Sequence, residues 1–100
     1  MIAENYPPLN VLSIFKGFDS PGLQHRITPY RIQKKNGETH IVKEVRQVTR
    51  HRTGGKLQYR FMVRSKEDFY VEILFDTHTY TWRLMKEVHR GVTVSEYGKK

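Results

Sequence analysis

The second half of the chain alternates between apolar and polar residues with a period of two, and this pattern restricts the fold more than any other feature. In residues 57–64, the odd-numbered positions are apolar or aromatic and the even-numbered positions are mostly polar. Successive side chains of a β-strand point to opposite faces, so the alternation predicts a half-buried strand. Residues 69–76 alternate in the same way and are apolar on much of both faces, which predicts a central strand. Residues 80–85 form a third segment of this kind.

Two glycine-containing turns indicate that the preceding segments are strands as well. Asn36-Gly37 is a dipeptide that type I′ hairpin turns favour, because both residues tolerate a positive φ. Residues 53–56, Thr-Gly-Gly-Lys, form a second turn of this kind. Residues 29–33 precede the first turn and suit an edge strand, because Pro29 has no N–H to donate to a ladder.

Residues 40–52, between these two turns, have an ambiguous pattern. Their aliphatic residues follow the spacing of a helix, whereas the many β-branched residues and the flanking hairpin turns favour a strand. We choose the strand. A regular strand cannot direct both Val45 and Val48 inward, because their separation is odd. We therefore predict a β-bulge near Arg46-Gln47, where one extra residue would correct the phase.

The N-terminal region is less constrained than the rest. Pro7 and Pro8 favour an extended entry, because the proline ring fixes φ and disfavours helix in the preceding residue. Asn10 could then cap a short helix over residues 11–16, which Gly17 would end. The same residues could instead form a strand. We favour the short helix.

These patterns together predict a mainly β protein. The predicted fold is a five-stranded antiparallel meander that forms a strongly bent sheet or a small open barrel. Its aromatic face must be covered, either by closure of the barrel or by the N-terminal segment, as a short helix or an extended cover. We divide the chain into an N-terminal cover segment, a β domain and a flexible C-terminal tail, at residues 1–26, 27–90 and 91–100.

Composition excludes several classes of protein. The chain has no cysteine, which excludes disulfides and thiolate metal sites. No apolar run approaches the roughly 20 residues of a membrane helix, so we expect no membrane insertion. The N-terminus lacks the pattern of a signal peptide, and we expect a cytoplasmic location. The formal net charge of +8 favours anionic partners such as nucleic acid, an acidic protein or an anionic membrane surface.

The positive charge is concentrated in the predicted hairpin around residues 53–56. Residues 41–66 carry eight lysines and arginines against one acid, whereas residues 67–80 carry four acids and neither lysine nor arginine. If Gly54 and Gly55 form the loop, Arg50 faces Tyr59 and could lie on its ring, which would serve as a platform. The predicted binding site is this basic ribbon, with Arg46, Arg50, Arg52, Lys56, Tyr59, Arg60 and Arg64.

Three functions fit such a ribbon. The first is a small non-enzymatic binding module that presents the hairpin to an acidic partner. The second is nucleic-acid binding by the same residues, since a two-stranded ribbon can enter a major groove or follow a single strand. The third is a structural role as a weak homodimer through an exposed sheet edge near Tyr30 or Tyr80. Alternatively, the ribbon is a solvated hairpin whose arginines pair with Glu72 or Glu67.

The sequence contains no pattern that indicates catalysis or a cofactor. None of its five histidines has a second histidine or a cysteine at metal-ligand spacing. Asp76-Thr77-His78 is more typical of a turn that the Asp side chain stabilises than of a metal site. Glu72 lies near basic residues of the neighbouring strands, and charge pairing accounts for it. We expect no enzymatic activity, no metal and no cofactor.

Four segments carry a resemblance to a known kind of protein. They are residues 41–45, 59–63, 70–76 and 82–84, and the pattern reads as a valine pair, a hairpin, an aromatic strand, an acidic turn and Trp-x-Leu. In this order they are similar to small uncharacterised bacterial β domains. The resemblance covers residues 41–88, and the chain departs from it by lacking an aromatic residue near Thr49. It implies a fold type and no activity.

Overall fold

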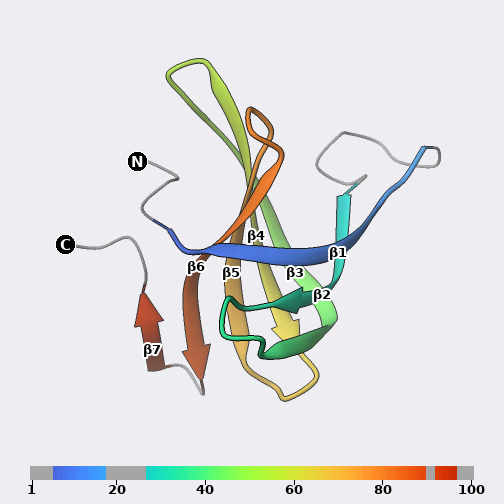
Figure 1. The fold of residues 1–100 in the computed structure, drawn as a ribbon, viewed down its shortest axis with the longest axis vertical. Coiled ribbons are helices and arrows are strands. Elements are labelled where there is room, and N and C mark those ends of the chain that lie inside the picture. The colour runs from blue at the N-terminus through green and yellow to red at the C-terminus, as the bar shows by residue number, and fades with distance from the viewer. Residues whose placement is uncertain (1–5, 18–26, 90–91, 97–100) are drawn as a thin grey trace.

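A computed structural model describes residues 6–17, 27–89 and 92–96, and over these residues the chain forms seven strands and no helix (Figure 1). Every pair of neighbouring strands is antiparallel. The strands are β1 (Pro8–Phe15), β2 (Ile27–Gln33), β3 (Thr39–Thr53), β4 (Lys56–Ser65), β5 (Tyr70–Asp76), β6 (Thr81–His89) and β7 (Val92–Glu96).

The first six strands close into a small barrel. Each pairs with the next in chain order, and β6 also returns to β1 through Pro8↔Arg83 and Leu9↔Trp82. The Leu84 N–H donates to the Pro7 carbonyl at 2.9 Å and extends this closure. The mainly β fold and the small barrel are therefore confirmed. The meander is longer than predicted, because β1 and β7 add a strand at each end.

The N-terminal segment is extended, and the short helix expected over residues 11–16 is wrong. β1 pairs with β2 along most of its length and with β6 at its start. Leu9 is buried beside Trp82, and Val11 packs on the core opposite Ile32. A helix would lose both ladders, so tertiary pairing outweighs the local signals of Asn10 and Gly17. The extended alternative describes this part of the cover segment.

The C-terminal region also differs from expectation. β6 continues to His89, beyond the predicted end of the last strand, and β7 pairs with it in the stretch Lys86–His89. Residues 92–96 of the expected flexible tail therefore belong to the sheet. β6 can accept β7 because its contacts with β1 lie at its other end. Residues 1–5, 18–26, 90–91 and 97–100 lie outside the described residues.

The turn between β2 and β3 is in the predicted place but has a different type. Only Gly37 has a positive φ, of 94°, so the type I′ geometry expected for Asn36-Gly37 is wrong. The Gly37 N–H donates to the Lys34 carbonyl at 2.9 Å, and the Lys34 N–H donates to the Glu38 carbonyl at 2.8 Å. This is the three-residue loop in which glycine adopts the left-handed conformation after a tight turn.

The long hairpin of β3 and β4 matches the prediction closely. Gly54 and Gly55 both have positive φ, 55° and 79°, as a type I′ turn requires. The register places Arg52 opposite Leu57 and Arg50 opposite Tyr59, as expected. The predicted bulge lies between Val45 and Gln47, and a second bulge, which the sequence analysis missed, lies between Val42 and Glu44. Bulges bend a strand, and here they turn β3 away from β2.

The barrel interior is filled by the aromatic and aliphatic side chains of the alternating segments. Phe61 is fully buried, and its ring centroid lies 5.3 Å from that of Trp82. The Phe75 ring lies 4.8 Å from Trp82, and the Phe15 ring packs edge-on against Phe75 at 5.8 Å. Pro29 lies on a stretch of β2 that pairs only with β1, which suits a residue without an N–H.

Candidate functional site

The hairpin of β3 and β4 positions the predicted binding residues, and its end projects beyond the neighbouring strands (Figure 1). Odd-numbered residues of β4 face the interior and even-numbered residues face outward. Arg60 and Arg64 therefore lie on the outer face, half-buried. Arg50 lies opposite Tyr59 and Arg52 opposite Leu57, so both arginines are on the inner face of the hairpin. Their side chains are nevertheless exposed. The predicted set is thus divided between two faces.

The arginines of the outer face are paired with carboxylates. Arg64 Nε lies 2.9 Å from Glu44 Oε1, and Arg64 Nη1 donates to Asp68 Oδ1 at 3.1 Å. The Arg64 Nε–H does not point at Glu44, so that contact is an ion pair without a hydrogen bond. Arg60 lies 4.0 Å from Glu72, as the pairing hypothesis expected. Arg83 instead donates to the Tyr6 carbonyl at 3.0 Å.

Arg46 is also engaged, and its partner is a ring that the sequence analysis did not select. Its guanidinium carbon lies 5.8 Å from the Tyr70 ring centroid, and Nη1 donates to the Tyr70 hydroxyl at 3.4 Å. The same guanidinium lies 3.6 Å from Glu44. Together with Tyr70, Arg46 borders a groove of about 360 Å³ that is completed by Gln47, Met62 and Val88.

Tyr59 does not serve as a platform. Its side chain is 1% exposed, because position 59 belongs to the interior row that also contains Phe61. A buried ring cannot stack on a ligand, and within the described part of the chain the cation–π contact is that of Arg46 with Tyr70, not of Arg50 with Tyr59. Tyr70 could have been found from the sequence, since the alternation places it on the polar face of the next strand, opposite Arg64.

The remaining cations gather at the hairpin tip, which we define as residues 50–56. Arg50, Arg52 and Lys56 are exposed, and no carboxylate of the described residues pairs with them. Within the described residues, the Arg52 side chain makes only a long contact, 3.5 Å, with the Gly55 carbonyl. His51 contacts the Thr53 hydroxyl at 2.7 Å, within the tip. The tip therefore presents uncompensated positive charge.

Comparisons of the chain with protein-family models, curated proteins and solved structures found no match. The resemblance to small bacterial β domains stays a prediction. No three His, Asp or Glu side chains in residues 6–17, 27–89 and 92–96 are placed to hold a metal ion. The same segments contain no helix with the length and hydrophobicity that crossing a membrane requires.

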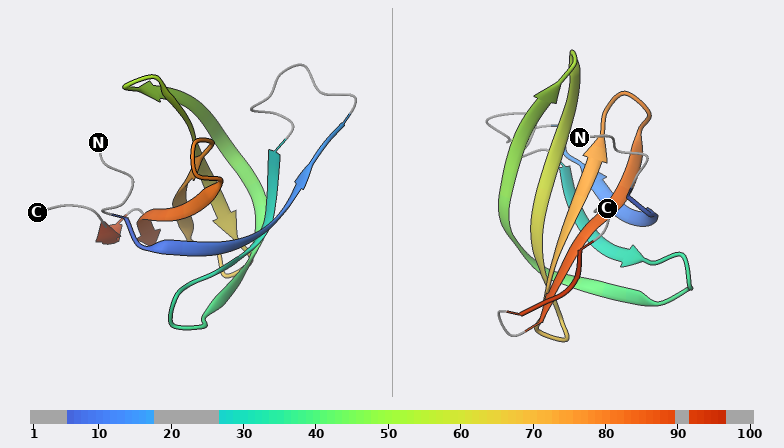
Figure 2. Two further views of the ribbon diagram at one scale, coloured as in Figure 1. Left: turned by 45° about the horizontal axis from the view of Figure 1, so that its top comes forward. Right: turned by 90° about the vertical axis from the view of Figure 1, so that its left-hand side faces the viewer.

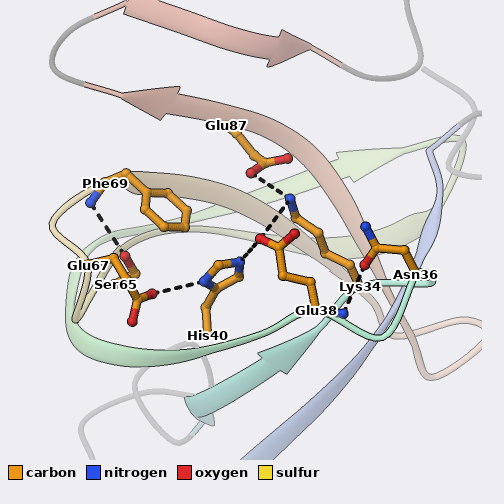
Figure 3. Close-up of polar contacts among 8 residues, drawn as sticks. All are labelled: Lys34, Asn36, Glu38, His40, Ser65, Glu67, Phe69 and Glu87. Carbon is orange, nitrogen blue, oxygen red and sulfur yellow. Dashed lines mark hydrogen bonds and ion pairs between the residues drawn. The ribbon is translucent and has the colours of Figure 1, made fainter.

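A second polar group lies at the opposite end of the barrel and joins four elements (Figure 3). His40 Nδ1 contacts Glu67 at 2.9 Å, and His40 Nε2 contacts Glu38 at 2.5 Å. Lys34 Nζ lies 2.9 Å from Glu87 and 3.6 Å from Glu38. Glu67 thus meets His40 rather than an arginine of the ribbon. The cluster links the β2–β3 turn, β3, the β4–β5 turn and β6, and its contacts hold these elements together.

The surroundings of Glu38 also set a pH dependence. The hydrogen bond with His40 and the charge of Lys34 lower the pKa of Glu38 below its ordinary value. A carboxyl with a lowered pKa in the folded state adds stability above its unfolded pKa. That contribution is lost as the pH falls through the lowered pKa. The carboxyl is exposed, so solvent screens the effect.

The turn of residues 77–80 lies next to the hairpin tip and contains an unusual residue. The Thr77 N–H and hydroxyl both donate to the Leu57 carbonyl, at 3.1 and 2.6 Å. Tyr80 ends this turn with a φ of 56° and a side chain that is 79% exposed. A bulky residue rarely adopts this left-handed conformation.

The expectation that Tyr80 marks a sheet edge is wrong, because Tyr80 lies in this turn and not on a strand. Tyr30 does lie on a stretch of β2 that pairs with β1 alone.

We expect the substitution Tyr80→Gly to raise the free energy of unfolding by about 0.5–1 kcal/mol, because glycine removes the left-handed strain at a smaller entropic cost. Thermal unfolding followed by circular dichroism measures this change. Thr79→Gly is the matched control, since Thr79 has no positive φ and should lose stability. An equal loss in both variants would mean that the Tyr80 side chain stabilises the turn.

Proposed function

We propose that this protein is a non-enzymatic binding module that presents its hairpin tip to an acidic protein surface. The observation that carries the proposal is that only some of the positive charges of the ribbon are paired with carboxylates. Carboxylates of the barrel already pair with its outer-face arginines, whereas Arg50, Arg52 and Lys56 are exposed and unpaired among the described residues. Guanidinium groups bind carboxylates in a bidentate geometry, so an acidic partner suits these side chains.

Nucleic acid is the second candidate, and one residue favours it. Proteins that bind single strands combine cations with exposed rings on which bases stack. Tyr59 is buried and cannot supply that ring, but the exposed Tyr80 lies on the turn that is hydrogen-bonded to Leu57. The acidic protein is preferred because three of the ribbon's five arginines already pair with carboxylates, which leaves few cations to follow a phosphate backbone.

The test compares a labelled 20-residue oligoglutamate with a 20-nucleotide single-stranded DNA, each titrated with the protein at two salt concentrations. The variant Arg50→Glu/Arg52→Glu reverses the charge of the tip. Its matched control is Lys35→Glu/Lys66→Glu, which makes the same change of net charge on exposed turns near the opposite end of the barrel. Circular dichroism verifies that both variants fold.

We expect the tip variant to bind oligoglutamate about tenfold or more weakly, and the control to change by less than about threefold. An equal loss of affinity in both variants would mean that binding depends on net charge alone, and would contradict a binding site at the tip. Tighter binding of the DNA, with a steep decrease as salt rises, would favour the nucleic-acid hypothesis.

A further inference from the structure

One edge of β3 has no described strand beside it over most of its length. β3 pairs with β4 from Val42 to Thr53, but it pairs with β2 only through Thr39, His40 and Ile41. From residue 42 onward, no other described strand is hydrogen-bonded to β3. Figure 2 shows β3 diverging from β2 as it rises into the hairpin. An unpaired edge of this kind is a template for another strand.

The backbone groups that face this open edge can be identified. The Leu57 carbonyl accepts hydrogen bonds from Thr77, on the side of β4 that faces away from β3. Leu57 therefore does not exchange hydrogen bonds with Arg52, its partner in the ladder. Arg52 must direct its own N–H and C=O away from β4. The direction of the backbone N–H and C=O groups alternates from one residue to the next along a strand. Arg50 and Val48 therefore also direct these groups away from β4.

The bulges limit the length of the usable edge. They lie before Glu44 and before Gln47, and the ladder from Gln47 to Thr53 is regular. A bulge interrupts the even spacing that an incoming strand needs. The regular stretch therefore offers the outward N–H and C=O groups of Val48, Arg50 and Arg52 to a segment of about seven residues.

We propose that this edge, residues 47–53, binds an extended acidic peptide as an additional antiparallel strand; this rests on the proposed function and specifies its partner. Residues directly opposite each other on antiparallel strands have Cβ atoms about 5 Å apart. Acidic side chains opposite Arg50 and Arg52 would therefore form ion pairs with two exposed guanidinium groups. Backbone hydrogen bonds supply affinity in this mode, and side chains supply selectivity.

The same charges disfavour a second copy of this chain as the occupant. Two β3 edges paired antiparallel would bring the row of Arg50 and Arg52 against the same row of the other copy. Like charges directly opposite each other destabilise a strand pair. Positive charge on an exposed edge is also a common protection against self-association. An acidic strand turns this repulsion into attraction.

The first test uses three eight-residue peptides with the sequence (Glu-Thr)₄, capped at both ends. One is unmodified, one is N-methylated at the glutamate amides, and one is N-methylated at the threonine amides. With glutamates opposite Arg50 and Arg52, the glutamate amides face β3 and the threonine amides face solvent. The two methylated peptides have the same charge and the same number of methyl groups.

We expect methylation at glutamate to weaken binding about tenfold or more, and methylation at threonine to weaken it by less than about threefold. If all three peptides bind equally, the result agrees with an acidic partner, but the proposal that it binds as an additional strand is wrong. If none of them binds, the strand proposal and the proposed function both fail.

A second test changes the protein. Arg50→Ala and Arg50→Pro both remove the charge, but only proline removes the outward N–H, and an edge strand tolerates it there. We expect the proline variant to bind the unmodified peptide about tenfold more weakly than the alanine variant. Two-dimensional NMR spectra verify that both variants fold. Equal affinities of two folded variants would overturn the proposal.

Discussion

Replacement of Phe61 by alanine is expected to lower the free energy of unfolding by about 3–5 kcal/mol, because it deletes a fully buried ring. Phe61 is 0% exposed, and β4 places it between Val48 of β3 and Ile73 of β5. Its ring also packs against Trp82 across the barrel. The cavity would therefore lie at the centre of the interior, where surrounding strands cannot collapse into it.

Urea denaturation at neutral pH measures the effect of Phe61→Ala. The matched control is Met62→Ala on the same strand, since Met62 faces outward and is only half-buried. We expect the control to lose about 1 kcal/mol. Similar losses in the two variants would mean that the barrel interior does not stabilise the fold more than its outer face. Domains of this size have a stability of about 5–15 kcal/mol, so Phe61→Ala should shift the denaturation midpoint clearly.

The hairpin of β3 and β4 shows why part of this fold could be predicted. A two-residue turn fixes the register of the strands that it joins, so Gly54-Gly55 was sufficient to place Arg52 opposite Leu57. The bulge at Arg46 followed from the odd spacing of Val45 and Val48. All of these signals lie within about ten residues of one another. Local geometry therefore determines them.

The closure of the barrel could not be predicted in the same way. It depends on Leu9 meeting Trp82, two residues that are far apart in the sequence. Asn10 and Gly17 gave local helix signals, and only the distant ladder partners of β1 outweigh them. The β-strand β7 was missed for a similar reason, because its stability comes from pairing with β6.

The sequence predicted where the charged binding residues lie, but not which of them form ion pairs. Sequence alone located the basic ribbon, yet it could not determine that Arg64 lies between Glu44 and Asp68 while Arg50 has no such partner among the described residues. The assignment of Tyr59 as a platform conflicted with the alternation itself, which places it in the interior row. The cluster around His40 was missed because its members come from four separate turns and strands.

Within that cluster, Lys34→Met is expected to lower the free energy of unfolding by about 3–5 kcal/mol at neutral pH, because it removes one partner of a buried ion pair. The Lys34 ammonium lies 2.9 Å from Glu87, whose side chain is 6% exposed and whose partner across the ladder is the buried Val71. The variant leaves this carboxylate in the barrel without the ammonium. Urea denaturation of the variant and the unmodified protein measures the difference.

A double variant separates this charge effect from lost packing. Lys34→Met/Glu87→Met should recover most of the loss, because apolar side chains of similar volume often replace a buried ion pair without net cost. A deficit that persists in the double variant would show that the Lys34 stem, rather than its charge, stabilises this end of the barrel.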